Sequence, residues 1–504
     1  MESEVCQFYE KRSVLVTGGT GLIGKCLVYN LLANCPDVGT IYLLLRKKRE
    51  FSFDQRRERY LNYDIFKNLK TPNLLNKLVF IEGAVDAKNL GLSNDILSKV
   101  TAEVSILFHS AASVGLEAGY KGAEQAANSN LRGTMNVLEL CRSMTNLACL
   151  VYVSTATAYH FKSLIEEKIY PVPCTPEQFL SVMESGDAKA IDKFLREDMK
   201  MFPNAYTLTK ALSENLCQAE NSNIPICIVR PPIVSSSVAT PVPGWTNKMQ
   251  AFNAMILLWV MGLSRCLTWD PDTRIEVAPV DYVCNVMITA AWFTGQKRPV
   301  DTVPVYNVVP SEDNSVTWRK LLEYSLDVVF ESPSIKAIRW PGRQMISPKT
   351  PFKFLYSIIF QHIIFAIFSD LFLICTGSSP QICALMIKMV NTIKSVRWFL
   401  TKDWHYINTN YLALTDHLNE HDRKLFPMSM KNMDWKSYIH TGYYGIRKFV
   451  LHEDDDNTKA AIGRLRRLTM ITNGAVIFAF LMIISMCFTL FLFLQYTILI
   501  HGRY

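Results

Sequence analysis

The chain has 504 residues, a formal net charge of +8 and 49% hydrophobic residues. Its length exceeds a single compact core, which predicts two or more domains. The basic excess is not concentrated in a long stretch interleaved with aromatic residues. We therefore exclude a nucleic-acid partner and attribute the charge to a membrane surface or a phosphate-bearing cofactor.

The 13 cysteines are scattered, with no CxxC pair and no His/Cys cluster at zinc spacing. We therefore expect free thiols in a reducing compartment and no bound metal. Residues 1–12 are polar and charged and lack the apolar stretch of a signal peptide, so we expect the catalytic part to fold in the cytosol.

Apolar runs alternate with helical patterns over the first two thirds of the chain. We predict strands at residues 14–16, 41–45, 78–81, 106–109, 150–154, 226–230 and 305–308, with helices between them that include 25–34 and 134–144. Strands that alternate with helices form a parallel sheet covered on both faces. The expected fold class is therefore α/β, a Rossmann-type doubly wound parallel sheet over residues 1–335.

Prolines and a glycine within residues 336–351 interrupt regular structure and indicate a linker. Residues 352–450 change to a helical pattern rich in aromatic residues, which predicts a smaller α-helical domain. Residues 451–474 are assigned as an acidic and then basic linker, in which Glu453 and the three aspartates after it are expected to be solvated.

Residues 475–500 contain no charged side chain. A helix of that length would extend about 39 Å at ~1.5 Å per residue. This is enough to cross a bilayer core of ~30 Å, so we predict a C-terminal transmembrane anchor. Arg464, Arg466 and Arg467 precede the segment and only Arg503 follows it, which predicts that the preceding domains lie in the cytosol.

A second apolar run, residues 354–375, contains Gln361, His362 and Asp370. An unpaired Asp in a bilayer-spanning helix costs about 2.5–3.5 kcal/mol. We therefore expect this run to form a buried or membrane-surface helix in preference to a second span.

The first predicted strand leads into a glycine-rich turn and then a helix. Glycines at 18, 21 and 24 let a pyrophosphate approach the backbone, and the free N–H groups of the helix would bind its negative charge. The residues assigned to this dinucleotide site are Gly18, Thr20, Gly21, Leu22, Ile23 and Gly24.

In sites for NAD, an acidic residue near the end of the second strand holds the ribose 2′-hydroxyl. Here that strand is followed by Arg46, Lys47, Lys48 and Arg49, with no carboxylate. Four cations suit a 2′-phosphate, so NADPH is favoured over NADH, with Arg46 as the assigned contact. The alternative, four surface charges without a ligand, stays open.

Two further motifs supply acid–base chemistry. Ser154 and Thr155 lie at the tip of an apolar strand, where a hydroxyl can donate to a carbonyl oxygen that gains charge. Tyr206 and Lys210 are one helical turn apart, so the ammonium can lower the tyrosine pKa and the phenol can donate a proton. In this order the motifs predict a short-chain-type reductase.

His109, at the end of its strand, is expected to be structural, and Asn130 is expected to hydrogen-bond the backbone near the catalytic strand. Ser110, Ala111 and Ala112 follow His109 and are expected to flank the adenosine ribose and the pyrophosphate of the cofactor.

Over most of its length, the chain resembles the alcohol-forming fatty acyl-CoA reductases, animal members especially, within the extended short-chain dehydrogenase/reductase group. The motifs that carry the resemblance are Thr17-Gly-Gly-Thr-Gly-Leu-Ile-Gly-Lys25, Leu90-Gly-Leu-Ser93, His109-Ser-Ala-Ala112, Val153-Ser-Thr-Ala156, Tyr206-Thr-Leu-Thr-Lys210, Ile228-Val-Arg-Pro-Pro-Ile-Val234, Pro243-Gly-Trp245, Pro279-Val-Asp281 and Gly442-Tyr-Tyr-Gly-Ile-Arg-Lys448. Residues 352–450 resemble the family's sterile-type second domain. That domain and Pro243-Gly-Trp245 are more specific than the glycine motif.

The resemblance implies a catalytic set of Thr155, Tyr206 and Lys210, acting as carbonyl donor, proton donor and pKa-lowering cation. It places the hydroxyl donor four residues before Tyr159, which selects Thr155 over Ser154.

The resemblance also implies that Tyr206, Lys210, Pro231 and Ile233 contact the cofactor. The implied reaction is the four-electron reduction of a long-chain acyl-CoA to a primary alcohol, with release of CoA, at the membrane of the endoplasmic reticulum or the peroxisome.

The sequence departs from the family pattern in two places. Gly115 stands where the family often has Arg, which predicts an altered contact to the substrate or the cofactor. Ala84 stands where an Asp is common, which predicts the loss of an adenine contact.

Two alternatives stay open. One is another membrane-bound extended reductase, such as a sterol or sugar-nucleotide enzyme, against which the helical region 352–450 argues. The other is a non-catalytic membrane scaffold that binds NADPH or lipid, against which the Tyr206/Lys210 pair argues. The oligomeric state and the preferred acyl chain do not follow from the sequence.

Overall fold

The computed structural model describes residues 2–47, 50–69, 71–114, 120–247, 251–264, 269–296, 302–310, 312–342, 350–453 and 457–501. At its centre is a seven-stranded parallel sheet with the order β11-β7-β5-β4-β1-β2-β3. Its strands are β1 (Ser13–Thr17), β2 (Ile41–Leu45), β3 (Leu78–Glu82), β4 (Val104–His109), β5 (Cys149–Val153), β7 (Ile226–Arg230) and β11 (Val305–Asn307). Every predicted strand is present with its ends within two residues, and the predicted α/β parallel sheet is confirmed.

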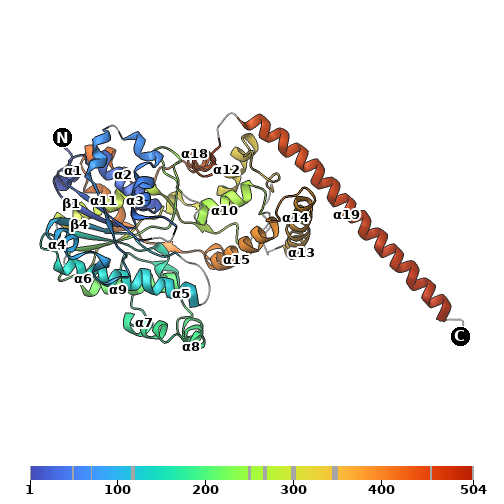
Figure 1. Ribbon diagram of the computed structural model, residues 1–504, viewed down its shortest axis with the longest axis horizontal. Helices are drawn as coiled ribbons and strands as arrows, with labels where there is room; N and C mark the ends of the chain where they lie inside the picture. Colours follow the sequence, from blue (N-terminus) through green and yellow to red (C-terminus); the bar gives the residue numbers. More distant parts are fainter. Residues whose placement is uncertain are drawn as a thin grey trace.

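Alternate side chains of β1 point to opposite faces of the sheet and build two cores. Val14 and Val16 belong to the buried cluster that includes α2 (Leu22–Asn34) and α11 (Val280–Gln296). Leu15 belongs to the cluster on the other face, with α6 (Gly133–Ser143) and α9 (Ala205–Ala219). Helices therefore cover the sheet on both sides (Figure 1). The predicted helices at 25–34 and 134–144 correspond to α2 and α6.

Further elements before residue 350 connect these layers. They are α1 (Glu4–Tyr9), α3 (Phe53–Leu61), α4 (Asn94–Glu103), α5 (Tyr120–Ala126), α7 (Pro176–Glu184), α8 (Ala188–Lys193), α10 (Ala251–Val260) and α12 (Trp318–Glu331), with the short strands β6 (Leu164–Ile165), β8 (Ile233–Ser235), β9 (Arg274–Ile275), β10 (Val277–Pro279) and β12 (Val316–Thr317).

The C-terminal region is helical, as predicted. Its elements are α13 (Pro351–Tyr356), a π-helical turn (Ser357–Ile364), α14 (Phe365–Cys375), α15 (Ile382–Leu400), β13 (His405–Tyr406), α16 (Thr409–Asp416), α17 (Glu420–Leu425) and α18 (Trp435–Gly445). Part of this region shares the core of the sheet: Tyr411 and Leu414 of α16 join the cluster of α2 and α11, and β13 pairs with β6. Because of this shared core, the domain boundaries 1–335 and 352–450 stay a prediction.

The predicted linker at 336–351 stays a prediction, whereas the one at 451–474 differs from the structure. Residues 343–349 lie outside the described residues. Glu453, which was expected to be solvated, is buried and forms an ion pair with Arg447 at 3.0 Å. The physical reason is that the equally buried Arg447 guanidinium requires a carboxylate partner. Residues 458–474 form the first turns of α19 (Thr458–His501), where a linker was expected.

α19 contains the predicted anchor and extends away from the rest of the molecule (Figure 1). Arg464 fixes its beginning, because the guanidinium donates hydrogen bonds to the carbonyls of Ile335 and Ala337. Among the helices whose side chains the structure describes, Pro351–Cys375 is long and apolar enough to cross a membrane, on length and composition only.

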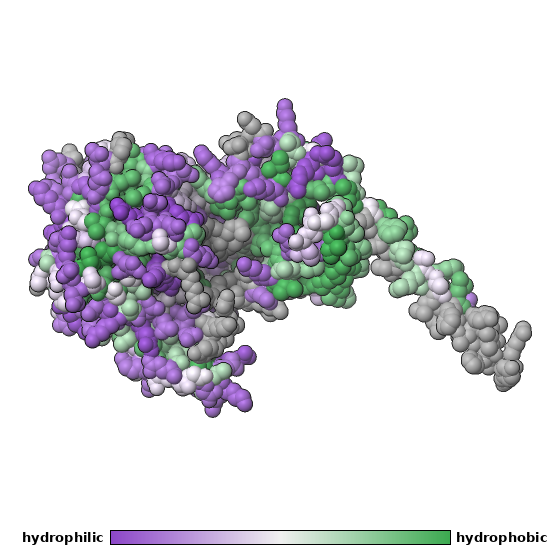
Figure 2. Space-filling view, in the orientation of Figure 1, coloured by the Kyte–Doolittle hydropathy of each residue, from purple (hydrophilic) through white to green (hydrophobic). Residues whose placement is uncertain are grey.

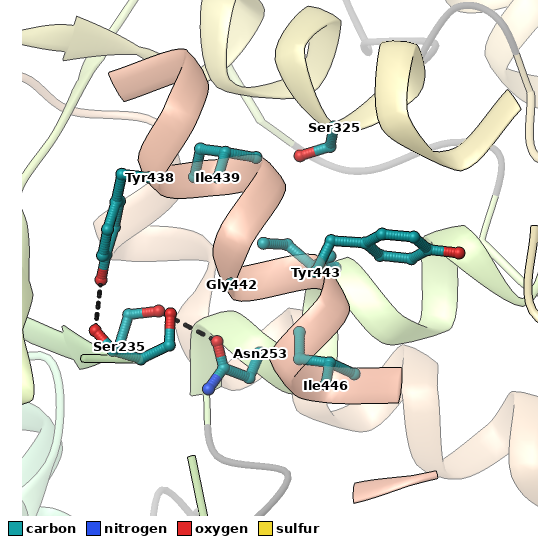
Figure 3. Close-up of a pocket in the computed structure, with 10 residues that line it drawn as sticks. Ser235, Asn253, Ser325, Tyr438, Ile439, Gly442, Tyr443 and Ile446 are labelled. Atoms are coloured by element: carbon teal, nitrogen blue, oxygen red, sulfur yellow. Dashed lines mark hydrogen bonds between the residues drawn. The ribbon is translucent and has the colours of Figure 1, made fainter. Parts of the chain in front are cut away.

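Three sequence motifs meet at the segment that follows β8. The carboxylate of Asp281 accepts hydrogen bonds from the backbone N–H groups of residues 238–240. Gly244, with φ +75°, lies against α18, where a Cβ on Gly445 would be 1.7 Å from the Gly244 carbonyl oxygen. Beside this contact is a small cavity, where Tyr438 donates a hydrogen bond to the backbone of Ser236 (Figure 3). Glycine is required here because the two backbones touch.

Gly445→Ala should lower the free energy of unfolding by about 1–3 kcal/mol or more, since the added methyl enters a filled contact. The matched control is Gly463→Ala on α19, where nothing lies within 4 Å of an added Cβ. The control should be neutral or stabilising by about 0.5–1 kcal/mol. Chemical denaturation of the detergent-solubilised protein measures both, and equal stabilities would contradict the contact between α18 and Gly244.

Candidate active site

The turn between β1 and α2 brings backbone close to backbone. Gly18 has φ +75°, and a Cβ there would lie 2.6 Å from the backbone nitrogen of Ala111. A Cβ on Gly24 would lie 2.4 Å from the carbonyl oxygen of Gly18. Gly21 precedes α2 and offers no side-chain cap, so the N–H groups of the first helical turn are open to an anion. The turn therefore fits a pyrophosphate.

The predicted residues Thr20, Leu22 and Ile23 lie in this turn and in the first turn of α2. Ser110, Ala111 and Ala112 follow β4, the neighbour of β1 in the sheet. The Ser110 hydroxyl donates a hydrogen bond to the carbonyl of Thr17 at 2.8 Å. The two predicted halves of the dinucleotide site are thus adjacent at the carboxyl ends of β1 and β4, which is where ligands bind in open α/β sheets.

His109 lies beneath this site. Its ring nitrogens contact the hydroxyls of Thr17 (2.7 Å) and Thr134 (3.3 Å). Burial, with a smaller contribution from the charge of Lys210, lowers the pKa of His109 to about 3. The imidazole is therefore neutral at physiological pH, and its contacts are those of a structural residue.

Asn130 lies in a π-helical turn (Ala127–Arg132) and is buried. Its side chain bonds the backbone N–H of Ser113 at 2.7 Å and the hydroxyl of Thr209 on α9 at 3.1 Å. We predicted a bond to the backbone near the catalytic strand. The backbone partner is the segment after β4, so Asn130 connects that segment to α9.

The two consecutive hydroxyl residues that follow β5 have different hydrogen-bond partners. Ser154 is buried and donates a 2.5 Å hydrogen bond to Glu214 of α9. Thr155 caps a short helical turn (Ala156–Tyr159), and its hydroxyl contacts that of Thr157 at 2.9 Å. The hydroxyl of Thr155 also lies close enough to the phenol of Tyr206 to lower the pKa of that phenol. Since the Ser154 hydroxyl is engaged by Glu214, Thr155 is the hydroxyl that faces Tyr206.

Tyr206 and Lys210 lie in the first turns of α9, which Asn204 caps. Burial raises the pKa of Tyr206 to about 12, and the neighbouring hydroxyl of Thr155 opposes that rise. Burial lowers the pKa of Lys210 to about 8, opposed by the charge of Glu214. The ammonium of Lys210 donates to the carbonyl of Val153 at 2.7 Å. At neutral pH both groups therefore hold their protons. The ammonium of Lys210 is directed to the strand in this arrangement, and the lowering of the Tyr206 pKa by Lys210 stays a prediction.

A buried ion pair holds α9 against the strand ends. Arg230, at the end of β7, donates to both carboxylate oxygens of Glu214, at 2.9 and 2.6 Å, and both side chains are fully buried. Burial lowers the pKa of Arg230, but the charge of Glu214, the hydrogen bonds to it and two neighbouring tyrosines together more than offset this, so the net shift of the pKa is upward. The pair was not anticipated from the sequence, although an Arg at a strand end and a Glu one turn after Lys210 were visible in it.

At the end of β2, Arg46 is exposed, and a second cation approaches it from α3. The pKa of Arg56 is lowered by burial and then by the charge of Arg46. Nη1 of Arg56 is buried and has no hydrogen-bond partner among the described residues. Two neighbouring guanidinium groups, one with an unpartnered donor, fit a phosphate. Arg56 was not predicted from the sequence, because its spacing from Arg46 carries no signal without the turn of the chain between them.

The remaining predicted positions are spread along the same edge. Pro231 follows β7, and its carbonyl accepts a hydrogen bond from the N–H of Ala156 at 2.9 Å. Ile233 begins β8. The backbone of Ala84 bonds that of Leu90. Gly115 lies outside the described residues.

Comparisons with known proteins agree over both regions. The NAD-binding part of the family described as “Male sterility protein” matches residues 16–287, and its Sterile part matches residues 361–453. “Fatty acyl-CoA reductase wat” of Drosophila melanogaster is 31% identical over 484 residues, which cover 95% of this chain and 92% of that protein. “Fatty acyl-CoA reductase 2” of Homo sapiens is 30% identical over 468 residues, covering 92% and 90%.

Solved structures share the fold. The terminal R domain of the myxalamid PKS-NRPS pathway superposes with a TM-score of 0.57 at 18% identity, covering 87% of this chain and 91% of that domain. The reductase (R) domain of a nonribosomal peptide synthetase from Mycobacterium tuberculosis superposes with a TM-score of 0.54 at 16% identity. The match covers 89% of this chain and 96% of that domain.

The parallel sheet and the glycine turn at its centre define a Rossmann-type oxidoreductase with a nicotinamide cofactor. The sequence relatives narrow the class: the chain belongs to the fatty acyl-CoA reductase family.

Glu214→Gln should lower the free energy of unfolding by about 3 kcal/mol or more, because it leaves the Arg230 charge buried without a counter-charge. The control is Glu220→Gln at the end of the same helix, whose ion pair with Arg142 is partly exposed. It should cost ~1 kcal/mol or less. Urea denaturation followed by circular dichroism compares the two, and a Glu214→Gln protein as stable as the control would refute the role given to the pair.

Proposed function

We propose that this enzyme reduces a long-chain fatty acyl-CoA to a primary alcohol, using NADPH and releasing CoA. The observation that carries the proposal is that Thr155, Tyr206 and Lys210 lie at the carboxyl edge of the sheet that also carries the glycine turn. The names of the sequence relatives support an acyl-CoA as the substrate.

Each side chain has one task. Thr155 donates a hydrogen bond to the thioester carbonyl oxygen and stabilises the negative charge that develops on it. Two molecules of NADPH, bound in turn, would supply one hydride each: the first for the thioester carbonyl, whose thiohemiacetal then releases CoA as the thiol, and the second for the resulting aldehyde. Tyr206 gives its phenolic proton to the alkoxide, for which a pKa of about 12 keeps the group loaded with its proton. Lys210, charged below a pKa of about 8, supplies positive potential beside the tyrosine.

Tyr206→Phe should cut alcohol formation at least ~10²-fold, the lower end of a general acid contribution. NADPH binding and the fold should stay nearly intact, since only one hydroxyl is removed. Tyr444→Phe, at an exposed position on α18, is the matched control and should retain full activity. The assay follows NADPH oxidation and alcohol formation from palmitoyl-CoA, and near-normal product from the Tyr206 variant would refute the assignment.

The same assay separates the alternatives. A sterol or sugar-nucleotide reductase would leave palmitoyl-CoA unreduced while turning over its own substrate. A non-catalytic scaffold would bind NADPH without oxidising it.

The preference for NADPH rests on the two guanidinium groups at the end of β2. Arg46 and the partly buried Arg56 would share the 2′-phosphate, which supplies the acceptor that Nη1 of Arg56 lacks among the described residues. NADH has a hydroxyl at that position and leaves the two cations facing each other.

Arg46→Ala and Arg56→Ala should each raise the Kd for NADPH about tenfold or more, the loss of a charged hydrogen bond. The Kd for NADH should change little. Arg57→Ala, on the outward side of α3, is the control and should affect neither cofactor. Fluorescence titration of both cofactors measures this, and equal weakening of NADH and NADPH would place the 2′-phosphate elsewhere.

We further propose that residues 475–500 of α19 anchor the enzyme in the membrane of the endoplasmic reticulum or the peroxisome, with the catalytic region in the cytosol. The support is an uncharged stretch about 39 Å long, preceded by Arg464, Arg466 and Arg467.

Removal of residues 468–504 should make the protein extractable by alkaline carbonate, whereas the full chain should resist extraction. Protease added outside intact organelles should digest the catalytic region of the full chain. A truncated protein that still resists carbonate would show that a further segment is embedded in the bilayer, and protection from protease would reverse the orientation.

A further inference from the structure

The long helix formed by α13, the π-helical turn and α14 exposes its large apolar side chains and buries mostly polar ones. Its buried positions are Ser357, His362, Ala366 and Asp370. Its exposed positions carry large apolar side chains: Phe352, Leu355, Tyr356, Ile359, Phe360, Ile363, Ile367, Phe368, Leu371, Phe372 and Ile374. Figure 2 shows the resulting apolar surface over α13 and α14. Soluble proteins rarely expose an apolar patch of this extent, and a polar inner face with an apolar outer face is expected where the surroundings are apolar.

The two charges of this helix do not interrupt the patch. Lys353 lies at its beginning. Asp370 turns inward, where its carboxylate accepts hydrogen bonds of 2.8–2.9 Å from the backbone N–H groups of residues 381–383, at the start of α15. A carboxylate at a helix N-terminus is favourably placed. Asp370 thus closes a helical hairpin, residues 351–400, and leaves the outer face uncharged.

The hairpin is fastened to the body of the enzyme. Arg339 donates hydrogen bonds to the carbonyls of Gly262 (2.5 Å) and Gln361 (2.7 Å) and lies 3.9 Å from the centre of the Phe365 ring. Ala366 packs in a cluster with Leu263 and two methionines of α15. A helix fastened in this way near its middle presents one side to its surroundings and cannot pass through a bilayer.

α15, the second helix of the hairpin, extends to the candidate active site. It is 19 residues long, or about 28 Å. At its far end the ring of Phe399 lies 5.4 Å from that of His160, and Trp404 stacks on the same imidazole at 3.8 Å. His160 directly follows the turn that Thr155 caps.

We propose that residues 351–375 dock on the membrane as a monotopic element, with the outer face embedded at the boundary between headgroups and acyl chains of the leaflet nearest the catalytic region. Such helices lie in the interface plane, with the apolar face ~5–10 Å deep. Docking would hold the candidate active site, through α15, at a fixed distance from the leaflet in which acyl chains partition. Only this role in substrate delivery rests on the proposed function.

The bilayer is the occupant that the structure favours. The hairpin and α19 lie at the same end of the molecule, away from the sheet (Figure 1), so a membrane that receives the uncharged half of α19 meets the apolar face as well. A return of α15 through the bilayer would carry Lys388, Lys394 and Arg397 into the hydrocarbon.

The test uses the full chain in phosphatidylcholine nanodiscs, with an environment-sensitive fluorescent amino acid replacing Phe372. The control carries it at Leu164, which is exposed on the reductase region. Spin-labelled lipids should quench position 372 at least about twofold more than position 164, and more strongly with the label near the headgroup than with the label at the bilayer centre.

Strongest quenching from the bilayer centre would overturn the proposal in favour of a span. Absence of quenching at position 372 would also overturn it, and crosslinks between two copies at this position would then identify a second chain as the cover. These readouts do not depend on activity. Ile363→Glu/Phe372→Glu should in addition lower turnover of vesicle-borne palmitoyl-CoA about tenfold and leave a water-soluble short-chain acyl-CoA unaffected. Loss on both substrates, or on neither, would refute the delivery role.

Discussion

The arrangement of the candidate active site depends on the buried pair of Arg230 and Glu214. Removing two charges from water is costly, and the cost is offset only when every donor and acceptor finds a partner. Here the guanidinium also donates to the carbonyls of Glu166 and Lys168, and the carboxylate accepts from Ser154. One pair therefore joins the end of β7, the tip of β5, the loop at 166–168 and helix α9.

This constraint explains the geometry of the acid–base residues. Glu214 lies one turn beyond Lys210 on α9, so fixing it to β5 and β7 fixes the register of the whole helix against the sheet. Lys210 then meets the carbonyl of Val153, and Tyr206 meets Thr155. The ion pair also occupies the Ser154 hydroxyl and leaves Thr155 as the neighbour of the phenol. The buried ion pair thus determines which hydroxyl lies beside the phenol of Tyr206.

The apolar substrate proposed for the site agrees with the way the rest of the chain is organised. The segment after β8 is held by Asp281 and by the contact between Gly244 and Gly445, so the C-terminal helices are fixed to the reductase core by backbone contact. The hairpin and α19 lie at one end of this rigid assembly (Figure 1), and the hairpin presents an apolar face. This polarity separates the nucleotide-binding edge of the sheet from the end of the molecule that we propose faces lipid.

The sequence by itself determined the α/β class, the strand positions and the glycine turn, because these follow from local patterns: apolar runs, helical periodicity and glycines that admit close backbone contact. It also indicated the Tyr206 and Lys210 pair, since both lie on one helical turn. Only the tertiary structure decided which partners these groups meet. Arg56 beside Arg46, Glu453 in the core and Asp370 at the start of α15 are brought together by turns and helix packing. The positions of these charged groups depend on burial and on the available hydrogen-bond partners. No local sequence pattern encodes either of them.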